Sequence, residues 1–298
     1  MKLTWIILKK AINKHNYNID LPEEFVHQNS IIKNKKQIAF KFNQFFADIG
    51  CTLSDSVPLS NNRYTDYLST PNEHSLFLDP VTPPELIDVM NKIKTKNSRD
   101  HNNLSTKLMQ STMINTVNPL THIINLSLSN GVVPNSMKIA KVIPIFKSGN
   151  QMHFTNYRPI SILPVFSKIL EKIIAKKLLT FVDSYSQLYP HQYGFRPAHN
   201  TIHPIIHLLN QIAEENDKSS KKLTMSVFLD LSKAFDTISH DILLTKLHHM
   251  GIRGIANDWF KSYLSGRKQY LEIHNEKSPL ESIKCGVPQG SILVQFYF

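Results

Sequence analysis

One stretch constrains this chain more than any other: residues 227–236, which read Val-Phe-Leu-Asp-Leu-Ser-Lys-Ala-Phe-Asp. Residues 226–229 are mostly apolar and suit a strand, and Asp230 follows where that strand would end. Mg²⁺ takes oxygen ligands, usually one or two carboxylates together with substrate phosphates. The stretch therefore predicts a metal-binding aspartate at a strand end. The alternative is a solvated turn aspartate after a core strand.

Composition and charge narrow the class of protein. A chain of 298 residues, 41% hydrophobic and 19% charged, is typical of one large or two ordinary globular domains rather than of a disordered protein. Lys and Arg number 34 against 23 Asp and Glu, which gives a formal charge of +11. Such a surplus favours a polyanionic partner, because neutralised phosphates release counterions. A generically basic protein is the alternative.

Cysteines and apolar runs indicate the compartment. Cys51 and Cys285 form no metal-binding pattern and indicate no disulfide framework, which is typical of a reducing compartment. No apolar run approaches the ~20 residues that cross a bilayer, and the first ten residues lack the features of a signal peptide. We expect an intracellular protein without a membrane segment, in the nucleus or cytoplasm, with no targeting signal evident.

The pattern along the chain predicts a mixed fold. Residues 1–80 read as a helical amino-terminal segment and linker, with a helix over 31–49 that stops at Gly50. From residue 81 onward, Thr82 and Glu85 form a capping box. Further helices are predicted at 105–113, 118–129, 166–182, from Thr201, and at 241–250 and 255–264. Strands are predicted at 141–146, 156–161 and 222–229, with a hairpin at 268–283 and a turn at 286–290 before a helix. This mixed order predicts an α+β fold.

Two basic residues flank the first predicted pair of strands. Lys147 lies in the turn and Arg158 follows it. Arg offers planar bidentate contacts and Lys a compact charge, so the pair would clamp a triphosphate from the side opposite the metal. The alternative is two solvated charges beside a strand.

Two further features would suit a nucleotide. Phe235 follows Asp230 by five residues, where its ring would pack under the sugar and leave no room for the 2′-hydroxyl that distinguishes RNA from DNA. Residues 286–290, Gly-Val-Pro-Gln-Gly, combine backbone freedom with one amide side chain, so a base or sugar would lie against this turn. The alternatives are an ordinary core phenylalanine and a simple turn before a helix.

The order of these strings resembles that of a known family. Non-LTR retrotransposon reverse transcriptases, above all those of jockey-type and related LINE elements, carry similar strings in the same order at 141–147, 156–173, 192–197, 227–236, 251–270 and 286–293. Residues 42–50 also look like the connector between endonuclease and polymerase in these polyproteins. The resemblance implies a right-hand polymerase, with a helical connector at 1–80 and fingers with a partial palm at 81–298.

The resemblance assigns a metal and a sugar contact. Asp230 matches the first catalytic aspartate of the palm, and the carbonyl of Leu231 would also face the metal, which is Mg²⁺ with Mn²⁺ as the alternative. Phe235 matches the aromatic residue that excludes ribonucleotides. Asp236 belongs to the same string but receives no metal role.

The resemblance also assigns the remaining nucleotide contacts. Lys147 and Arg158 match residues of the fingers that contact the incoming triphosphate, and Gln289 and Gly290 match a pair that borders the nucleotide and the template strand. The implied activity is RNA-directed DNA synthesis from an RNA template, a DNA primer or nicked target DNA, and dNTPs. A primer 3′-hydroxyl would attack an α-phosphate, with two Mg²⁺ ions about 4 Å apart.

Three departures from the family qualify this expectation. The family continues past this point with a Gly-Pro-rich helix start and an aromatic-x-Asp-Asp hairpin, whereas residues 294–298 read Val-Gln-Phe-Tyr-Phe. We also expect no endonuclease before residue 1, and residues 99–103 read Arg-Asp-His-Asn-Asn where the family usually has Gly-x-Asp-Gly.

One palm carboxylate does not hold two Mg²⁺ ions, so we expect these 298 residues alone to lack processive synthesis. The alternatives are a non-catalytic nucleic-acid-binding remnant and a fragment that does not fold stably, because cutting the palm leaves sheet edges and apolar surface uncovered.

Overall fold

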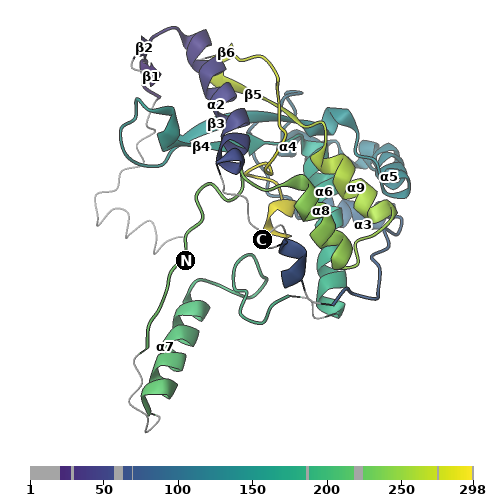
Figure 1. Ribbon diagram of the computed structural model, residues 1–298. Coiled ribbons are helices and arrows are strands. Elements are labelled where there is room, and N and C mark those ends of the chain that lie inside the picture. Colours follow the sequence, from purple (N-terminus) through teal and green to yellow (C-terminus); the bar gives the residue numbers. More distant parts are fainter. Residues whose placement is uncertain are drawn as a thin grey trace, which may run out of the picture.

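The computed structural model describes residues 21–27, 30–56, 63–68, 70–185, 188–217, 224–273 and 275–296. Helices and strands are mixed along the chain, which confirms the α+β prediction (Figure 1). A small sheet carries one helix on one face, and a larger group of helices lies beside it.

The sheet has five strands in the described part of the chain. β3 (Ile139–Phe146) pairs antiparallel with β4 (Tyr157–Ile162) on one side and parallel with β5 (Lys268–Ile273) on the other. Two short strands, β6 (Glu276–Lys277) and β7 (Glu281–Ser282), pair antiparallel with β5. A separate hairpin joins β1 (Phe25–His27) to β2 (Ser30–Ile32). The strand pair predicted at 141–161 and the hairpin predicted at 268–283 are therefore confirmed.

Helix α2 (Lys35–Asp55) covers one face of this sheet. Asn34 caps its start by accepting a hydrogen bond from the backbone N–H of Gln37 at 3.1 Å. Its buried side chains pack with residues of the sheet, of strand β1 and of the connection between β3 and β4. The core that they form contains Phe25, Ile38, Ala39, Phe42, Phe46, Val142, Phe154, Tyr157, Leu271 and Ile273. Within it, the buried amides of Asn43 and Gln269 bond at 3.1 Å. The domain boundary near residue 80 stays a prediction.

The sequence predicts that this helix stops at Gly50. In the structure it continues to Asp55. Gly50 has another role, because a Cβ atom built there would lie 1.9 Å from the carbonyl oxygen of Asp236 and 2.8 Å from the sulfur of Cys285. The missing side chain allows α2 to approach a neighbouring segment closely. The prediction was wrong because the sequence does not show which glycine serves packing rather than termination.

Replacing Gly50 with alanine gives the first testable prediction. In a helix interior this change normally stabilises a protein by about 0.5–1 kcal/mol. Here the new methyl group would overlap the carbonyl of Asp236, so we expect the free energy of unfolding to fall by ~1–3 kcal/mol instead. Urea denaturation of the variant, compared with Thr52→Ala at an exposed position of the same helix, measures the effect. A gain in stability for Gly50→Ala would contradict the close approach.

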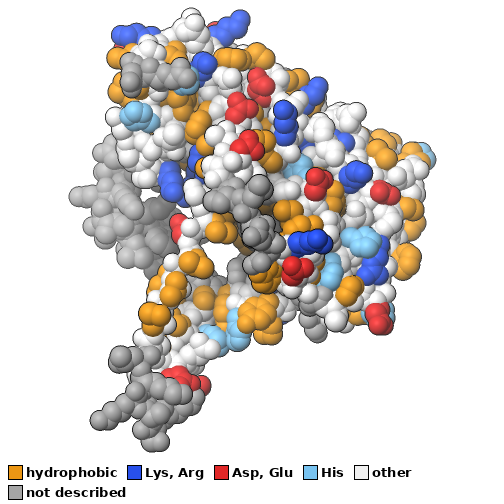
Figure 2. Space-filling model, viewed as in Figure 1, with side chains coloured by type: hydrophobic (Ala, Val, Ile, Leu, Met, Phe, Trp, Pro, Cys, Tyr) orange, Lys and Arg blue, Asp and Glu red, His pale blue; other side chains and the backbone are white. Residues whose placement is uncertain are grey.

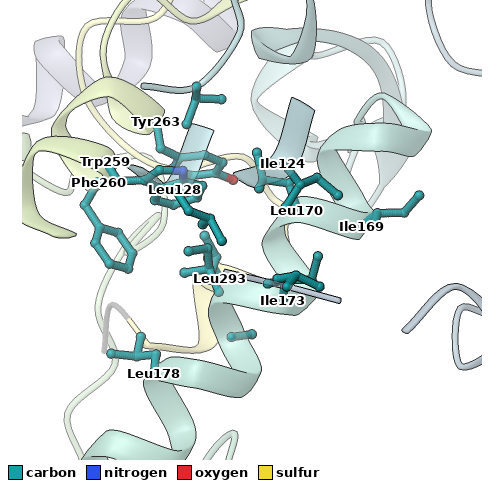
Figure 3. Close-up of a cluster of buried hydrophobic side chains, with 14 of the residues drawn as sticks. Ile124, Leu128, Ile169, Leu170, Ile173, Leu178, Trp259, Phe260, Tyr263 and Leu293 are labelled. Carbon is teal, nitrogen blue, oxygen red and sulfur yellow. The ribbon is translucent and has the colours of Figure 1, made fainter. Parts of the chain in front are cut away.

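The larger core lies among the helices. It is formed by α3 (Pro83–Asn91), α4 (Thr106–Ser111), α5 (Met113–Asn130), α6 (Val165–Ser184), α8 (His240–His249) and α9 (Ile255–Leu264). Figure 3 shows Trp259, Phe260 and Tyr263 of α9 facing side chains of α5 and α6. Thr82 caps α3 by accepting from the N–H of Glu85, so this predicted helix start is confirmed.

The polar loop at 99–103 is tied to this layer. Asp100 is buried, and its carboxylate accepts hydrogen bonds from the backbone N–H groups of Asn102, Leu104 and Val165 at 2.9, 3.0 and 2.9 Å. Val165 is the first residue of α6. The loop therefore orders its own turn and the start of the helix beside it.

Helix α7 (Ile202–Asp217) stands away from the rest of the molecule (Figure 1). None of its residues is buried. Among the helices that the structure describes, none combines the length and apolar character needed to span a membrane.

Candidate functional site

The hairpin of β3 and β4 presents the two predicted basic residues. Arg158 pairs across the hairpin with Ile145, and Lys147 lies two residues beyond Ile145. The N–H of Lys147 donates to the carbonyl of Asn156 at 2.8 Å and closes the hairpin. Both side chains are exposed. The structure therefore places Lys147 and Arg158 on the same hairpin with both side chains exposed, and their joint binding of an anionic ligand stays a prediction.

The turn at 286–290 is fastened to two other segments. The N–H groups of Gly286 and Val287 donate to the carbonyls of Ile238 and Phe235, each at 2.8 Å. The carbonyl of Gln289 accepts from the N–H of Ser161, also at 2.8 Å. The turn thus joins the segment after Asp230 to strand β4, the strand that carries Arg158.

Gly290 is required by this joint. Its φ is +127°, and a Cβ atom there would lie 2.7 Å from the carbonyl oxygen of Ser161. A side chain would therefore strain the backbone and push the turn from β4. The sequence singled out Gly290 for close approach to a ligand, and the close approach in the structure is to β4.

Gln289 and Asp236 form the polar centre of the joint. The Nε2 of Gln289 donates to both carboxylate oxygens of Asp236, at 3.0 and 3.1 Å. Burial raises the pKa of Asp236, while this hydrogen bond and the charge of Lys233 act in the opposite direction. Sequence reasoning gave Asp236 no metal role and missed its part as the partner that orients Gln289. Its place six residues after Asp230, in the same string, was the available signal.

Phe235 lies at the edge of the larger core. It is partly buried, and its ring lies 6.5 Å from that of Phe195 in an edge-on arrangement. Its carbonyl accepts from Val287. The structure therefore brings Phe235, Gln289 and Gly290 together around one turn, although the last two are distant from Phe235 in the sequence.

Asp230 and Leu231 are not brought to this turn. Residues 224–230 carry no regular secondary structure, so the strand predicted at 222–229 is wrong over 224–229, and residues 222–223 lie outside the described residues. Asp230 is exposed, and the apolar residues around it are exposed as well, Phe228 by 81% and Leu229 by 89%. The run has the composition of a strand, but a strand also needs a partner for its backbone, and no described strand pairs with it. Figure 2 shows hydrophobic side chains gathered along the extended segment that connects α7 to the rest of the molecule.

Two lysines lie beside the joint. Lys233 is half-buried, and its Nζ lies 4.5 Å from the centre of the Phe45 ring. Burial lowers the pKa of Lys233, Asp236 opposes this, and the nearby charge of Lys147 adds to it. Lys147 and Lys233 therefore form a positively charged rim beside Asp236, which suits an anionic ligand. Arg158 lies outside this rim. It alternates along β4 with Pro159 and Ser161, which line the cavity at Asp236 and Gln289, so its side chain leaves the strand from the opposite face.

The donor set for a metal is incomplete in the described residues. No group of three or more His, Cys, Asp or Glu side chains lies together there in a way that would hold a metal ion. Asp230 offers one carboxylate and Leu231 a carbonyl oxygen, and both are the hard oxygen donors that Mg²⁺ accepts. These two residues fit part of a site that substrate phosphates would complete.

A buried network anchors the far end of the turn. Glu171 of α6 is fully buried, and its Oε1 accepts from the hydroxyls of Tyr263 at 2.9 Å and Ser167 at 3.1 Å. Its Oε2 accepts from the hydroxyl of Ser291 at 3.1 Å and from the N–H of Ile292 at 2.8 Å. Burial raises the pKa of Glu171, and these donors counteract that shift. The network fixes the chain directly after Gly290.

A large groove lies beside residues 231–239, the segment that leads into this joint. Its volume is about 1,070 Å³, and it runs between α6, α8, residues 188–197 and residues 231–239. The lining is mostly apolar, with Leu178, Val182, Leu188, Ile238, Leu243, Leu247 and Phe296 among its members. Its chemistry therefore differs from that of the charged rim.

Comparison with known proteins identifies relatives of this chain. A family model described as reverse transcriptase (RNA-dependent DNA polymerase) matches residues 145–298. The probable RNA-directed DNA polymerase from transposon BS of Drosophila melanogaster is 30% identical over 229 residues, which is 76% of this chain and 25% of that protein.

Two further relatives agree with this result. The RNA-directed DNA polymerase from mobile element jockey of Drosophila funebris is 32% identical over 227 residues, 76% of this chain and 24% of that protein. A Pol polyprotein from the type-1 retrotransposable element R2 of Popillia japonica is 28% identical over 176 residues, 59% of this chain and 24% of that protein. The chain spans about a quarter of the length of these curated relatives.

Proposed function

The chain belongs to the reverse transcriptase (RNA-dependent DNA polymerase) family, and from this premise we propose that it forms the nucleotide-binding part of an RNA-directed DNA polymerase. The observation that carries the proposal is the joint between the turn at 286–290, the segment that contains Phe235 and Asp236, and strand β4. This joint brings Phe235 together with Gln289 and Gly290, which are distant from it in the sequence, beside Lys233, and this arrangement supports the proposal. In this proposal the described fold corresponds to the fingers and the first part of the palm.

Each of the site residues has a proposed role. Lys147 and Arg158, on the same hairpin, bind the triphosphate and stabilise charge that develops on it. Phe235 packs against the sugar and excludes a 2′-hydroxyl. Gln289, held by Asp236, borders the nucleotide together with Gly290.

Asp230 and Leu231 are proposed to hold a divalent cation, Mg²⁺ or Mn²⁺, together with substrate phosphates. When bound, such an ion stabilises negative charge on the attacking and leaving oxygens. Because residues 224–230 are exposed and carry no regular structure, Asp230 reaches the joint in this proposal when that segment pairs with further chain or substrate.

The proposed substrates are an RNA template, a DNA primer or target DNA, and dNTPs. The formal charge of +11 supports a nucleic-acid partner. These substrates place the protein in the nucleus or cytoplasm. With Asp230 as the single proposed metal-binding carboxylate, we also propose that residues 1–298 alone do not sustain synthesis.

A chimaera tests this function. Residues 1–298 are joined to the segment that follows the matched region in the jockey polymerase of Drosophila funebris, and the product is given an RNA template, a DNA primer, dNTPs and Mg²⁺. We expect template-dependent primer extension. A chimaera that is folded and binds the RNA–DNA hybrid but adds no nucleotide would overturn the proposal.

A second function, non-catalytic binding of nucleic acid, is favoured by the exposed position of Asp230 away from the joint. It predicts that the 298-residue chain binds RNA or DNA with an affinity that falls steeply with salt, and that Asp230→Asn leaves this binding unchanged. Fluorescence anisotropy at several salt concentrations measures it.

A further inference from the structure

The only two cysteines of the chain meet in the structure. Cys51 lies on α2, and Cys285 immediately precedes the turn at 286–290. They are 234 residues apart in the sequence, yet their sulfur atoms are 3.0 Å apart. Both are free thiols, and both are partly exposed. Nothing in the sequence pattern indicates this pairing.

We propose that Cys51 and Cys285 form a reversible intramolecular disulfide that fixes α2 to the turn carrying Gln289. The inference concerns the thiols and the segments that bear them, so it stands apart from the proposed polymerase activity.

The backbone on both sides of the pair is held in place. Gly50, next to Cys51, and Gly286, next to Cys285, both approach the carbonyl of Asp236 so closely that a Cβ atom at either would lie 1.9 or 2.6 Å from its oxygen. The backbone N–H of Gly286 also donates a hydrogen bond to the carbonyl of Ile238 at 2.8 Å. Because a disulfide requires its two residues to be held close together, this fixed arrangement favours a bond between the two sulfurs over bonds to other molecules.

A small-molecule disulfide, such as oxidised glutathione, serves as the oxidant for this reaction. The Cys51 thiolate attacks one sulfur of glutathione disulfide, the S–S bond breaks, and one glutathione leaves as its thiol. The Cys285 thiolate then attacks the Cys51 sulfur of the mixed disulfide, and the second glutathione leaves. The two cysteines lose two electrons and two protons, which the two glutathione molecules receive.

The surroundings of Cys285 set the rate at which the disulfide closes. Burial raises the pKa of the Cys285 thiol to about 12, with Cys51, Asp236 and Asp55 contributing in the same direction. Because the thiolate is the nucleophile, the raised pKa slows the attack of Cys285 on the mixed disulfide. The rate of closure therefore increases with pH.

The consequence is mechanical. In the reduced protein, α2 is held on the sheet by its apolar face and by the amide pair of Asn43 and Gln269. The disulfide adds a covalent link between Cys51, in the carboxyl-terminal part of α2, and Cys285, which lies four residues before Gln289. Oxidation thus fixes the amino-terminal helix to the joint without changing either core.

A glutathione redox titration of the full 298-residue chain tests the proposal. At increasing ratios of oxidised to reduced glutathione, we expect peptide mapping by mass spectrometry to find the Cys51–Cys285 link in monomeric protein. Because the link closes a very long loop, the melting temperature should rise by roughly 5 °C and return on addition of dithiothreitol. Glutathione adducts at both cysteines, disulfide-linked dimers as the main product, or a link that leaves the melting temperature unchanged would overturn it.

Single serine variants serve as matched controls. Cys51→Ser and Cys285→Ser should each lose the oxidation-dependent shift while keeping the melting temperature of the reduced protein. If a variant does not fold, the comparison of oxidised and reduced wild-type protein decides the question by itself, because both samples have the same sequence.

Discussion

Asp230→Asn is expected to lower the rate of single-nucleotide addition by the jockey chimaera by roughly 10³-fold. The carboxylate is the only side-chain ligand for the divalent cation that residues 1–298 are proposed to supply, and a neutral amide attracts that cation far less. The side chain is exposed and lies in a segment without regular structure, so the change should leave the melting temperature as it was. Rapid-quench measurement of one dNTP addition on an RNA template gives the rate.

Asp241→Asn is the matched control. Asp241 is also an exposed aspartate, in the first turn of α8, and it lies outside the proposed site. It should retain the full rate. Equal rates for the wild type and Asp230→Asn would remove Asp230 from the metal site, while equal losses in both variants would point to a general effect of charge on substrate binding.

Glu171→Ala is expected to lower the free energy of unfolding by about 3–5 kcal/mol. The carboxylate is fully buried and accepts from Ser167, Tyr263, Ser291 and Ile292. Its removal leaves these donors without a partner and leaves the nearby buried Arg267 without its counter-charge. Urea denaturation measures the loss, and Thr180→Ala at an exposed site on α6 is the control. A loss below about 1 kcal/mol, the level of a typical net hydrogen bond, would contradict the network.

Glu171→Gln separates charge from shape. Burial raises the pKa of Glu171 above its value in the unfolded chain. A carboxyl group with a raised folded-state pKa contributes stability that is fully present below the unfolded pKa, about 4.3, and is lost as pH rises through the folded pKa. The stability of the wild type relative to Glu171→Gln should therefore increase as pH falls from 7 towards 5. Parallel stability curves for the two proteins would show that Glu171 does not titrate in this range.

Local patterns predicted most elements of the fold. Helix α9 occupies residues 255–264, as its amphipathic spacing indicates, and Thr82 caps α3 through the predicted hydrogen bond. These features depend on residues a few positions apart, so the sequence contains the necessary information. Gly50 shows the limit, because its role depends on the carbonyl of Asp236, which only the folded chain brings near.

The candidate site also combines features that nearby residues predict with contacts between residues far apart in the sequence. The place of Lys147 and Arg158 on one hairpin follows from its two short strands and their register. By contrast, the bond between Gln289 and Asp236 joins residues 53 positions apart, and the network at Glu171 reaches Ile292 across 121 positions. The prediction of a strand before Asp230 was wrong for a different reason. The composition of that segment favours a strand, but no described strand pairs with it.

Nucleotide selection by Phe235→Ala in the jockey chimaera tests most directly the central claim that these residues form a deoxynucleotide site. The quantity is the ratio of kcat/KM for a dNTP to that for the matching rNTP, which cancels any loss of folded protein. Removing the ring from the proposed sugar contact should lower this ratio by roughly 10²-fold, whereas Phe195→Ala, which removes the exposed neighbouring ring, should leave it unchanged. An unaltered ratio in Phe235→Ala would contradict the account.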